Sequence, residues 1–276
     1  MSEPTSHSGH RNGGFGSSFG FIIACVGSAV GLGNIWMFPY RLGQYGGAAF
    51  LIPYLFFVLL FGWVGLSAEF GIGRLAGTGT IGAYEYCFAA RGKKKLGGAL
   101  SWLPLMGSLG IAIGYAVILG WVLNSLAGFI SGQLMSADPA PFFQAAASSF
   151  GNPIWHTAVV AVVCLVLIFG VSAGIERVSK VLMPLFFLLF LVLAAWVFTL
   201  PGAGEGYRFL FVPHWDQLLR AETWIMAMGQ AFFSLSITGS GMIVYGAYLK
   251  KDADIPGASL RTAFFDTLAA MLSAVA

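Results

Sequence analysis

Charged residues are scarce in this sequence, making up 9% of it, against about 25% in an ordinary soluble domain. Six stretches contain no Asp, Glu, Lys or Arg, namely 12–40, 42–68, 96–137, 139–175, 181–204 and 223–249. A helix that spans a bilayer needs roughly 20 predominantly apolar residues, and each of these stretches is long enough. The scarcity of charge therefore excludes a soluble enzyme or a nucleic-acid-binding protein and predicts an all-α integral membrane protein.

Cysteine and histidine are also rare. Cys25, Cys87 and Cys164 are isolated, with no CxxC pair and no metal-ligand spacing, so a disulfide scaffold is excluded and small core residues are favoured over a redox or metal role. The first fourteen residues lack an apolar run with a cleavage site, so they do not form a signal peptide.

The apolar stretches predict helices at 15–40, 46–73, 97–130, 154–171, 178–200 and 222–249, with a seventh helix beginning near 258. The run from Asp266 to the last residue is free of further charge, and a helix that begins near 258 needs several more residues to cross a membrane. We therefore expect the chain to stop within its seventh span, as a truncated protein.

Basic residues indicate the orientation of these spans. With the N-terminus in the cytoplasm, the outer side holds Arg41, Arg208 and Arg220. The cytoplasmic side then holds Arg11, Arg74, Arg91, Lys93, Lys94, Lys95, Arg177, Lys180, Lys250, Lys251 and Arg261. Because positive charge concentrates in cytoplasmic loops, the N-terminus is predicted to be cytoplasmic.

Two of the spans contain residues that a plain lipid-facing helix avoids. The first, at 27–39, has three glycines in seven residues and then Asn34, and the sixth, at 233–241, has four hydroxyl residues and two glycines in eight. Irregular backbone at membrane depth is tolerated where it is buried in protein or lines a cavity, and its free carbonyls can coordinate a cation. Small residues also serve close helix packing, which remains the alternative for either segment alone.

The acids expected within the membrane are Glu69 and Asp266, and ionisable groups there are costly and usually functional. Glu69 lies near Arg74, so a structural hydrogen bond is an alternative to a functional role. Asp266 is predicted either to neutralise a cation or to cap the seventh helix. Tyr54, Tyr115 and Gln230 place polar groups on apolar spans.

Several ordered motifs resemble the neurotransmitter:sodium symporter family. They are Gly27–Tyr40 (GSAVGLGNIWMFPY), Gly46–Gly47, Pro53–Tyr54, Glu69–Arg74 (EFGIGR), Gly114–Tyr115 through Trp121, Gln230–Ser236 (QAFFSLS) and Tyr245 to Asp252. The resemblance covers almost the whole chain. It implies an inverted-repeat transporter fold of eleven or twelve helices with broken first and sixth helices.

The resemblance also implies an organisation for this chain. Residues 1–14 would form a cytoplasmic tail, 15–200 the first five-helix repeat, and 201–276 the start of a second repeat that is truncated. The implied activity is sodium-coupled import of an amino acid by alternating access, with lipid bilayer, amino acid and sodium as partners and no nucleic acid. The implied location is the plasma (cytoplasmic) membrane, and a bacterial inner membrane is expected.

Two sodium sites follow from the resemblance, each residue named by its position here. The first would use Asn34, Ser234, Asp266 and the Ala29 carbonyl. The second would use the carbonyls of Gly27 and Val30, and it would be incomplete because its other ligands belong to an eighth helix.

The resemblance implies a substrate site at the two breaks. The residues expected to bind the amino acid are Ala29, Leu32, Gly33, Ile111, Tyr115, Phe233, Ser234, Ser236 and Gly239. The backbone of Leu32 and Gly33 and the Tyr115 hydroxyl would hold the carboxylate, and Ile111, Phe233 and Gly239 would line the side-chain pocket.

Departures from the family pattern refine these expectations. Gly31 stands where monoamine carriers have Asp, so a substrate with its own carboxylate is favoured. Met37 stands where the family has an arginine of the outer gate. Arg41 is a candidate to take the role of that arginine. Gly239 replaces an aromatic residue, which favours a roomier pocket and a large side chain.

Chloride is expected to be unnecessary. Tyr54, Gln230 and Ser234 match the family's anion ligands, but Ala270 replaces a further Ser, and Asp266 one turn away supplies a fixed negative charge. These residues are therefore expected to be a remnant of an anion site.

The residues disfavour two other functions. A channel is disfavoured because the sequence offers no pore-lining ring of charge. An enzyme with Ser240 as nucleophile needs a nearby base, and no His follows His214. A non-transporting amino-acid sensor and an inactive truncated fragment remain as alternatives.

Overall fold

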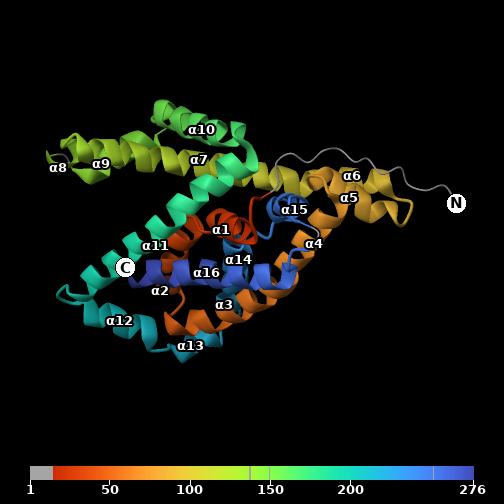
Figure 1. Cartoon of the computed structure of the whole chain (residues 1–276). Helices are drawn as coiled ribbons and strands as arrows, with labels where there is room; N and C mark the ends of the chain where they lie inside the picture. The colour runs from red at the N-terminus through yellow and green to blue at the C-terminus, as the bar shows by residue number, and fades with distance from the viewer. Residues whose placement is uncertain (1–14, 137, 149, 251) are drawn as a thin grey trace.

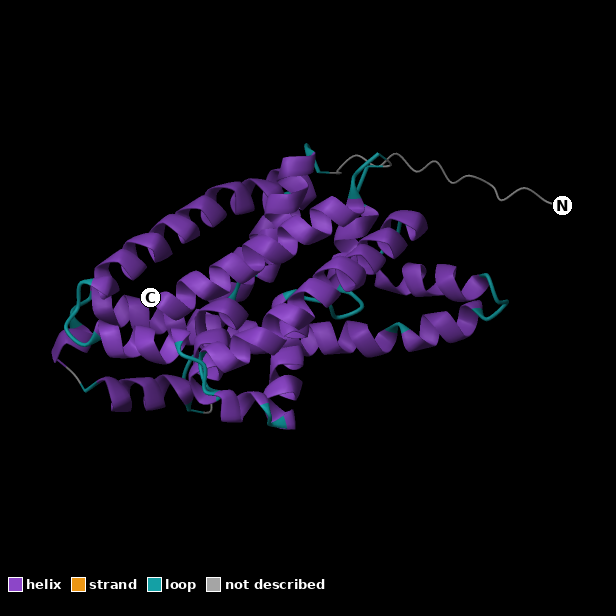
Figure 2. Ribbon diagram, turned by 90° about the horizontal axis from the view of Figure 1, so that it is seen from below, coloured by secondary structure: helices purple, strands orange, loops and turns teal. Residues whose placement is uncertain are grey.

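The computed structural model describes residues 15–136, 138–148, 150–250 and 252–276. The expected tail at 1–14 lies outside the described residues. The described part of the chain is built of helices and loops and contains no strand (Figures 1 and 2). The expectation of an all-α protein is confirmed.

The first expected span is broken. Helix α1 (Ser18–Ala29) begins at Ser17, whose hydroxyl accepts a hydrogen bond from the Gly20 N–H at 2.9 Å. The chain then leaves the helix over 30–32 and continues as the π-helical turn η1 (Gly33–Met37) and α2 (Phe38–Gln44), bent by 53° from α1. The break falls within the glycine-rich motif, as predicted.

The second to fifth expected spans are also helical. They are formed by α3 (Ala48–Leu60), η2 (Phe61–Gly65) and α4 (Leu66–Ala76); α6 (Lys94–Leu100) and α7 (Trp102–Ile130); α10 (Pro153–Ile168); and η3 (Val171–Glu176) with α11 (Arg177–Phe198). Their connections contain helices that were not predicted, namely α5 (Thr80–Ala89), α8 (Gln133–Ser136), α9 (Pro139–Ala147), α12 (Ala203–Phe211) and α13 (Trp215–Leu218).

The sixth expected span is broken as predicted, into α14 (Ala221–Ser234) and α15 (Gly241–Ala247). The seventh helix, α16 (Ile255–Val275), begins earlier than expected because the Asp254 carboxylate caps it by accepting a hydrogen bond from the Gly257 N–H. Asp266 therefore lies in the middle of α16 and does not cap it. The capping alternative for Asp266 is wrong.

Among the described residues, three helical stretches are long and apolar enough to cross a membrane: Ala48–Ala76, Lys94–Ile130 and Ala173–Phe198. The bent pair of α1 with η1 and α2 qualifies as a fourth if it is taken as one span. Helix α10 is apolar but shorter. The sixth segment does not qualify because its break leaves two short helices.

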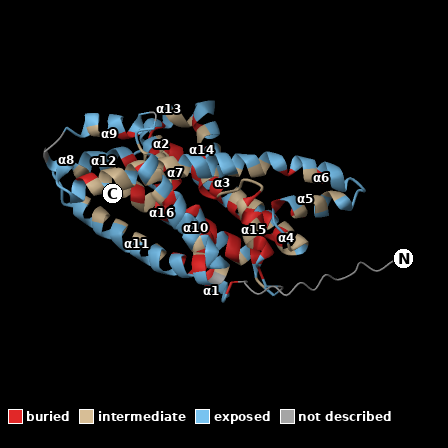
Figure 3. Cartoon of the chain, turned by 90° about the horizontal axis from the view of Figure 1, so that it is seen from above, coloured by how far each residue is buried: buried red, intermediate tan, exposed pale blue. Residues whose placement is uncertain are grey.

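The core lies where α1, α3, α4, α14, α15 and α16 meet, and these helices carry most of the buried residues (Figure 3). Helices α7 to α10 form a layer along one side of this core, and α11 to α13 lie along another (Figure 1). Aromatic rings fill part of the core: Tyr54 lies 4.8 Å from Phe38 and 6.1 Å from Phe50 between ring centroids. The two breaks therefore lie in the best-packed part of the molecule.

Glycines allow α4 and α15 to pack backbone to backbone. A Cβ at Gly73 would collide with the carbonyl oxygen of Ile243, and a Cβ at Gly246 would collide with the backbone of Phe70. This packing brings α4, which carries Glu69, against the second half of the broken sixth span.

Gly73→Ala is expected to lower the free energy of unfolding by about 1–3 kcal/mol, because the added methyl forces the two backbones apart. Gly71→Ala on the same helix is the matched control: no atom lies within 4 Å of its Cβ position. The control should be neutral or stabilising by up to about 1 kcal/mol through helix propensity. Thermal unfolding of both variants in detergent measures the difference, and equal effects would contradict the packing argument.

Candidate functional site

The two breaks face a common cavity of about 470 Å³. Its lining comes from the first span, from one face of α7 and from the sixth span: Gly27, Ser28, Val30, Gly31, Leu32, Ile35, Ser108, Ile111, Ala112, Tyr115, Leu119, Phe233, Ser236 and Thr238. A neighbouring cavity of about 380 Å³ shares Leu32 and Ile35 and continues along α7 toward Trp121. Irregular backbone thus lines a cavity, which is where a membrane protein tolerates it.

The first break is stabilised by the side chain of Asn34. Its Oδ1 accepts a hydrogen bond from the Gly31 N–H at 3.0 Å, which satisfies one backbone group that the break frees from the helix. The Gly33 carbonyl accepts a hydrogen bond from Gln230 Nε2 at 3.0 Å. The sixth span therefore supports the first at its break.

A buried polar cluster lies directly behind this break. The Asn34 Nδ2 group donates to Ser234 Oγ at 3.1 Å and to Asp266 Oδ1 at 2.8 Å, and Ser234 Oγ donates to Asp266 Oδ2 at 2.6 Å. The exposed fractions of the three residues are 0%, 1% and 0%. The structure thus brings together three of the residues predicted for the first sodium site, from the first, sixth and seventh helices.

The cluster contains side-chain types that can bind a hard cation. Carboxylate, hydroxyl, amide and carbonyl oxygens are the ligands that hard cations prefer, and Asp266 is the one acid among them. In the described part of the chain, no group of three or more His, Cys, Asp or Glu side chains gathers where it could hold a metal ion. The cluster thus presents carboxylate and hydroxyl oxygens, while Asn34 turns its amide nitrogen toward them and its oxygen toward the Gly31 N–H.

The sixth span breaks over residues 235–240, where two residues adopt positive φ: Ser236 at 54° and Gly239 at 72°. The Ser236 hydroxyl donates to the Ser28 carbonyl at 3.3 Å, which joins the two breaks. The Gly239 N–H donates to Glu69 Oε1 at 2.8 Å. Of the two roles considered for Glu69, a structural hydrogen bond is the one that the geometry displays.

The predicted substrate residues fall into three groups. Leu32, Ile111, Tyr115, Phe233 and Ser236 line the cavity, as do Gly27 and Val30 of the second predicted sodium site. Ala29, Gly33 and Ser234 are buried and are not part of the lining, although each is next in sequence to a residue that is. The ring of Phe233 stacks at 6.1 Å from that of Tyr115, so these two side chains bridge the cavity between α14 and α7.

Gly239 lies elsewhere. A Cβ there would meet Tyr84 Oη at 2.7 Å and Pro104 Cβ at 3.3 Å, and Gly239 is not part of the cavity lining. The space that an aromatic side chain would take is thus occupied by Tyr84 from α5. Arg41 donates to the Met226 carbonyl at 3.3 Å, outside the cavity lining.

The predicted anion-site remnant is buried. Tyr54 and Gln230 both have an exposed fraction of 0%. The Tyr54 hydroxyl and Gln230 Oε1 have no hydrogen-bond partner among the described residues. Ser240, considered as a nucleophile, pairs with the Thr80 hydroxyl at 3.0 Å instead of with a base.

Sequence reasoning missed the contribution of Ser108 and Thr238. Their hydroxyl oxygens lie 3.3 Å apart at one end of the cavity. Helical spacing could have found Ser108, because positions 108, 111, 112, 115 and 119 share one face of a helix. Thr238 lay within the motif that was singled out, but nothing in the sequence identified its partner.

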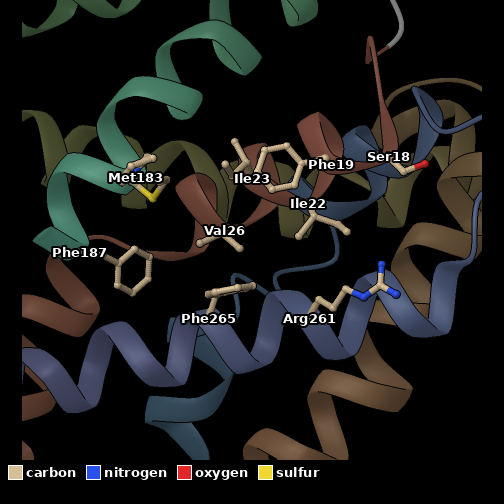
Figure 4. Close-up of a pocket in the computed structure, with 10 residues that line it drawn as sticks. Ser18, Phe19, Ile22, Ile23, Val26, Met183, Phe187, Arg261 and Phe265 are labelled. Carbon is tan, nitrogen blue, oxygen red and sulfur yellow. The ribbon is translucent and has the colours of Figure 1, made fainter.

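A second cavity, of about 360 Å³, lies between α1, α11 and α16. Figure 4 shows Ile22 and Val26 facing Phe187 and Phe265 across it, with Arg261 at one end. Its lining is almost wholly apolar. A zwitterion would find more hydrogen-bonding groups in the cavity between the two breaks, which is lined by hydroxyl side chains and by backbone outside regular helix.

Comparison with known proteins agrees with this geometry. The family model described as the sodium:neurotransmitter symporter family matches residues 12–139 and 140–276. An uncharacterized sodium-dependent transporter of Bacillus subtilis (strain 168) is 38% identical over 264 residues, which are 94% of this chain and 57% of that protein. The sodium-dependent neutral amino acid transporter B(0)AT3 of Rattus norvegicus is 32% identical, over 83% of this chain and 41% of that protein.

Among solved structures, the crystal structure of MhsT in complex with L-phenylalanine is similar to this chain with a TM-score of 0.82 and 39% identity. The match covers 95% of this chain and 60% of MhsT. The chain thus spans a little over half the length of the bacterial relative and of MhsT, and a smaller share of the rat protein.

Ser234→Ala is expected to lower the free energy of unfolding by about 1–3 kcal/mol, because it leaves Asp266 Oδ2 without its donor in a buried site. Thr262→Val is the control. It removes a fully buried hydroxyl from the same helix as Asp266, but that hydroxyl donates only to a carbonyl in its own helical turn, Ala258 O at 2.9 Å. Unfolding in sodium-free detergent solution measures both variants, and a loss no larger than the control's would show that the cluster contributes little.

Proposed function

Because the chain belongs to the sodium:neurotransmitter symporter family, we propose that it forms the amino-acid and sodium sites of a sodium-coupled symporter that imports an amino acid by alternating access. The observation that carries this proposal is that the Asn34–Ser234–Asp266 cluster adjoins the cavity lining: Asn34 accepts a hydrogen bond from the N–H of Gly31, and Ser234 follows Phe233, and Gly31 and Phe233 both line the cavity. A cation at the cluster and a zwitterion in the cavity would lie side by side.

The first sodium ion binds at Asn34, Ser234 and Asp266 together with the carbonyl of Ala29, where α1 ends. The Asp266 carboxylate offsets the charge of the ion in a buried place. A second sodium ion binds the carbonyls of Gly27 and Val30 with ligands from outside this chain, so that site is incomplete here.

The amino acid lies along the first break. Its carboxylate accepts hydrogen bonds from the backbone of Leu32 and Gly33 and from Tyr115, whose ring lies against Gly31. Its ammonium meets the Ser236 hydroxyl and the carbonyls that the two breaks free, including those of Phe233 and Ser234. This assignment is supported by the cavity lining and by the similarity to MhsT, which was solved with L-phenylalanine.

The side chain of the substrate points toward Ile111 and Phe233. The cavity of about 470 Å³ accommodates a large or aromatic side chain. Gly31 leaves the cavity without a fixed anion, so a substrate that brings its own carboxylate is favoured over a simple amine.

Sodium supplies the driving force. One charge that moves down about 100 mV releases roughly 2.3 kcal/mol before any concentration term. Because the substrate carboxylate and the first sodium ion would be neighbours, each would raise the affinity of the other. The chain would lie in the cytoplasmic membrane of a bacterium with its N-terminus inside, and its first five helices and the start of the second repeat would follow the inverted-repeat organisation.

Sodium-dependent binding tests this proposal. The chain, and a version extended by the segment that its relatives carry beyond the match, are purified and incubated with radiolabelled amino acids in sodium or potassium. We expect saturable binding in sodium only, strongest for large neutral side chains. Accumulation in vesicles with a sodium gradient then separates a symporter from a sensor, which binds without accumulating. Equal binding in both salts would count against the sodium site.

Asp266→Asn is expected to raise the sodium concentration needed for half-maximal binding by at least about tenfold, because the ion loses a buried counter-charge. Glu85→Gln is the control, since this acid pairs with Lys94 at 3.5 Å on the surface. The same assay with chloride replaced by gluconate should leave binding by the parent unchanged. A strong loss of binding without chloride would instead assign Tyr54, Gln230 and Ser234 to a working anion site.

A further inference from the structure

The segment 238–240 of the sixth span lies at one end of the substrate cavity, where Thr238 is part of the lining. The cavity follows α7 from Ser108 to Leu119, and Ser108 pairs with the Thr238 hydroxyl at its first end. Pro104 lies one helical turn further from the cavity and faces Gly239. Whatever holds this segment in place therefore controls how firmly this end of the cavity is closed.

Part of that support comes from α5, a short helix in the connection between the second and third spans. Its Thr80 side chain pairs with Ser240 at 3.0 Å between hydroxyl oxygens. The exposed fractions of the two residues are 4% and 5%, so this is a buried hydroxyl pair in a part of the chain that is otherwise a surface connection. Connecting segments normally leave their polar side chains in water, which makes this pair unusual.

Tyr84, one turn further along α5, provides the second contact. Its hydroxyl oxygen would lie 2.7 Å from a Cβ at Gly239, so the tyrosine fills the space that glycine leaves open. Tyr86 on the same helix is 53% exposed and marks the opposite face. Helix α5 thus presents one face, with Thr80 and Tyr84, to the irregular segment of the sixth span.

We propose that Thr80 and Tyr84 are positioning residues of the substrate site, through which α5 holds residues 238–240 closed beneath the cavity. The inference rests on the proposed function, because it concerns the same cavity. Movement of α5 away from Gly239 removes the support of the Ser108–Thr238 contact and opens this end to the side of the membrane on which α5 lies. Closure on this side is thereby assigned to a connecting helix as well as to the spans.

A cysteine placed in the cavity tests the proposal. Cys87 and Cys164, both exposed, are changed to Ser, Cys25 is buried, and Ala112→Cys supplies the reporter on α7. A membrane-impermeant thiol reagent is applied in turn to each face of sealed vesicles. Tyr84→Ala is expected to raise the labelling rate from the α5 face by about fivefold, the factor that corresponds to loosening the contact by 1 kcal/mol.

The controls distinguish positioning from general damage. Tyr84→Phe removes the hydroxyl that faces Gly239 but keeps the ring, so its labelling rate should lie between those of the parent and Tyr84→Ala, and Tyr86→Ala should match the parent. Labelling from the opposite face should not change in any variant. Thr80→Val, which removes the hydroxyl pair with little change in volume, should raise labelling in the same direction as Tyr84→Ala and replaces that variant if it does not accumulate.

A double-mutant comparison examines the contact itself. Gly239→Ala should weaken sodium-dependent binding of the amino acid, because its methyl meets Tyr84 Oη and its φ of 72° is strained. In a Tyr84→Phe background the strain remains but the colliding oxygen is gone, so the loss should be smaller. Equal losses in the two backgrounds would overturn the assignment of Tyr84.

The two proposals fail separately. Labelling does not require substrate, so it reports on α5 even if the parent binds no amino acid, whereas the proposed function is refuted by the binding and accumulation assays described above. If the parent binds amino acid in sodium, but Tyr84→Ala and Thr80→Val label from the α5 face at the Tyr86→Ala rate, α5 has no positioning role and this inference falls.

Discussion

The buried carboxylate of Asp266 is the group on which the arrangement of the broken helices depends. A charge in the interior of a membrane protein is tolerated only when other groups satisfy it. Here Asn34 and Ser234 both donate to it, one from the bend of the first span and one from the last turn of α14. Moving any of the three helices would leave a buried polar group without a partner, so the cluster ties them together at the break.

The same constraint explains why the breaks were predictable. Glycine at 27, 31 and 33 and hydroxyl residues from 234 to 240 are costly in a lipid-facing helix, and the bilayer leaves few ways to accommodate them. The sequence pattern therefore predicted the helices and the two breaks. The family resemblance predicted that Asn34, Ser234 and Asp266 come together. The unpredicted helices lie in polar connections, where no comparable constraint acts.

Contacts between residues far apart in the sequence could not be predicted in this way. The absence of a side chain at Gly239 favoured a roomier pocket. Sequence alone does not tell which neighbouring residue fills the space, and in the structure Tyr84 from α5 fills it. Asp266 was placed near a helix start because apolar periodicity locates helix ends poorly, whereas the actual cap is Asp254. From the sequence, Glu69 was expected to interact with Arg74, five positions along the chain, but it accepts a hydrogen bond from the backbone N–H of Gly239, 170 residues away.

The cavity lies between parts of the chain that differ in packing. In the stretch Ala48–Ala76, 39% of an apolar 18-residue segment is buried inside the chain. The corresponding share is 6% in Lys94–Ile130, which contains α7. Helix α7 packs its backbone mainly on α6, α8, α9 and α10, so it meets the broken helices chiefly through side chains. Tyr115 against Phe233 and Ser108 against Thr238 are two such contacts, one of rings and one of hydroxyls. Each such contact contributes about 1 kcal/mol, so within this chain α7 is joined to the broken helices less firmly than the Asp266 cluster joins those helices to one another. The cavity is thus bounded on one side by broken helices that the buried Asp266 cluster holds together, and on the other by a helix that reaches it through single side chains.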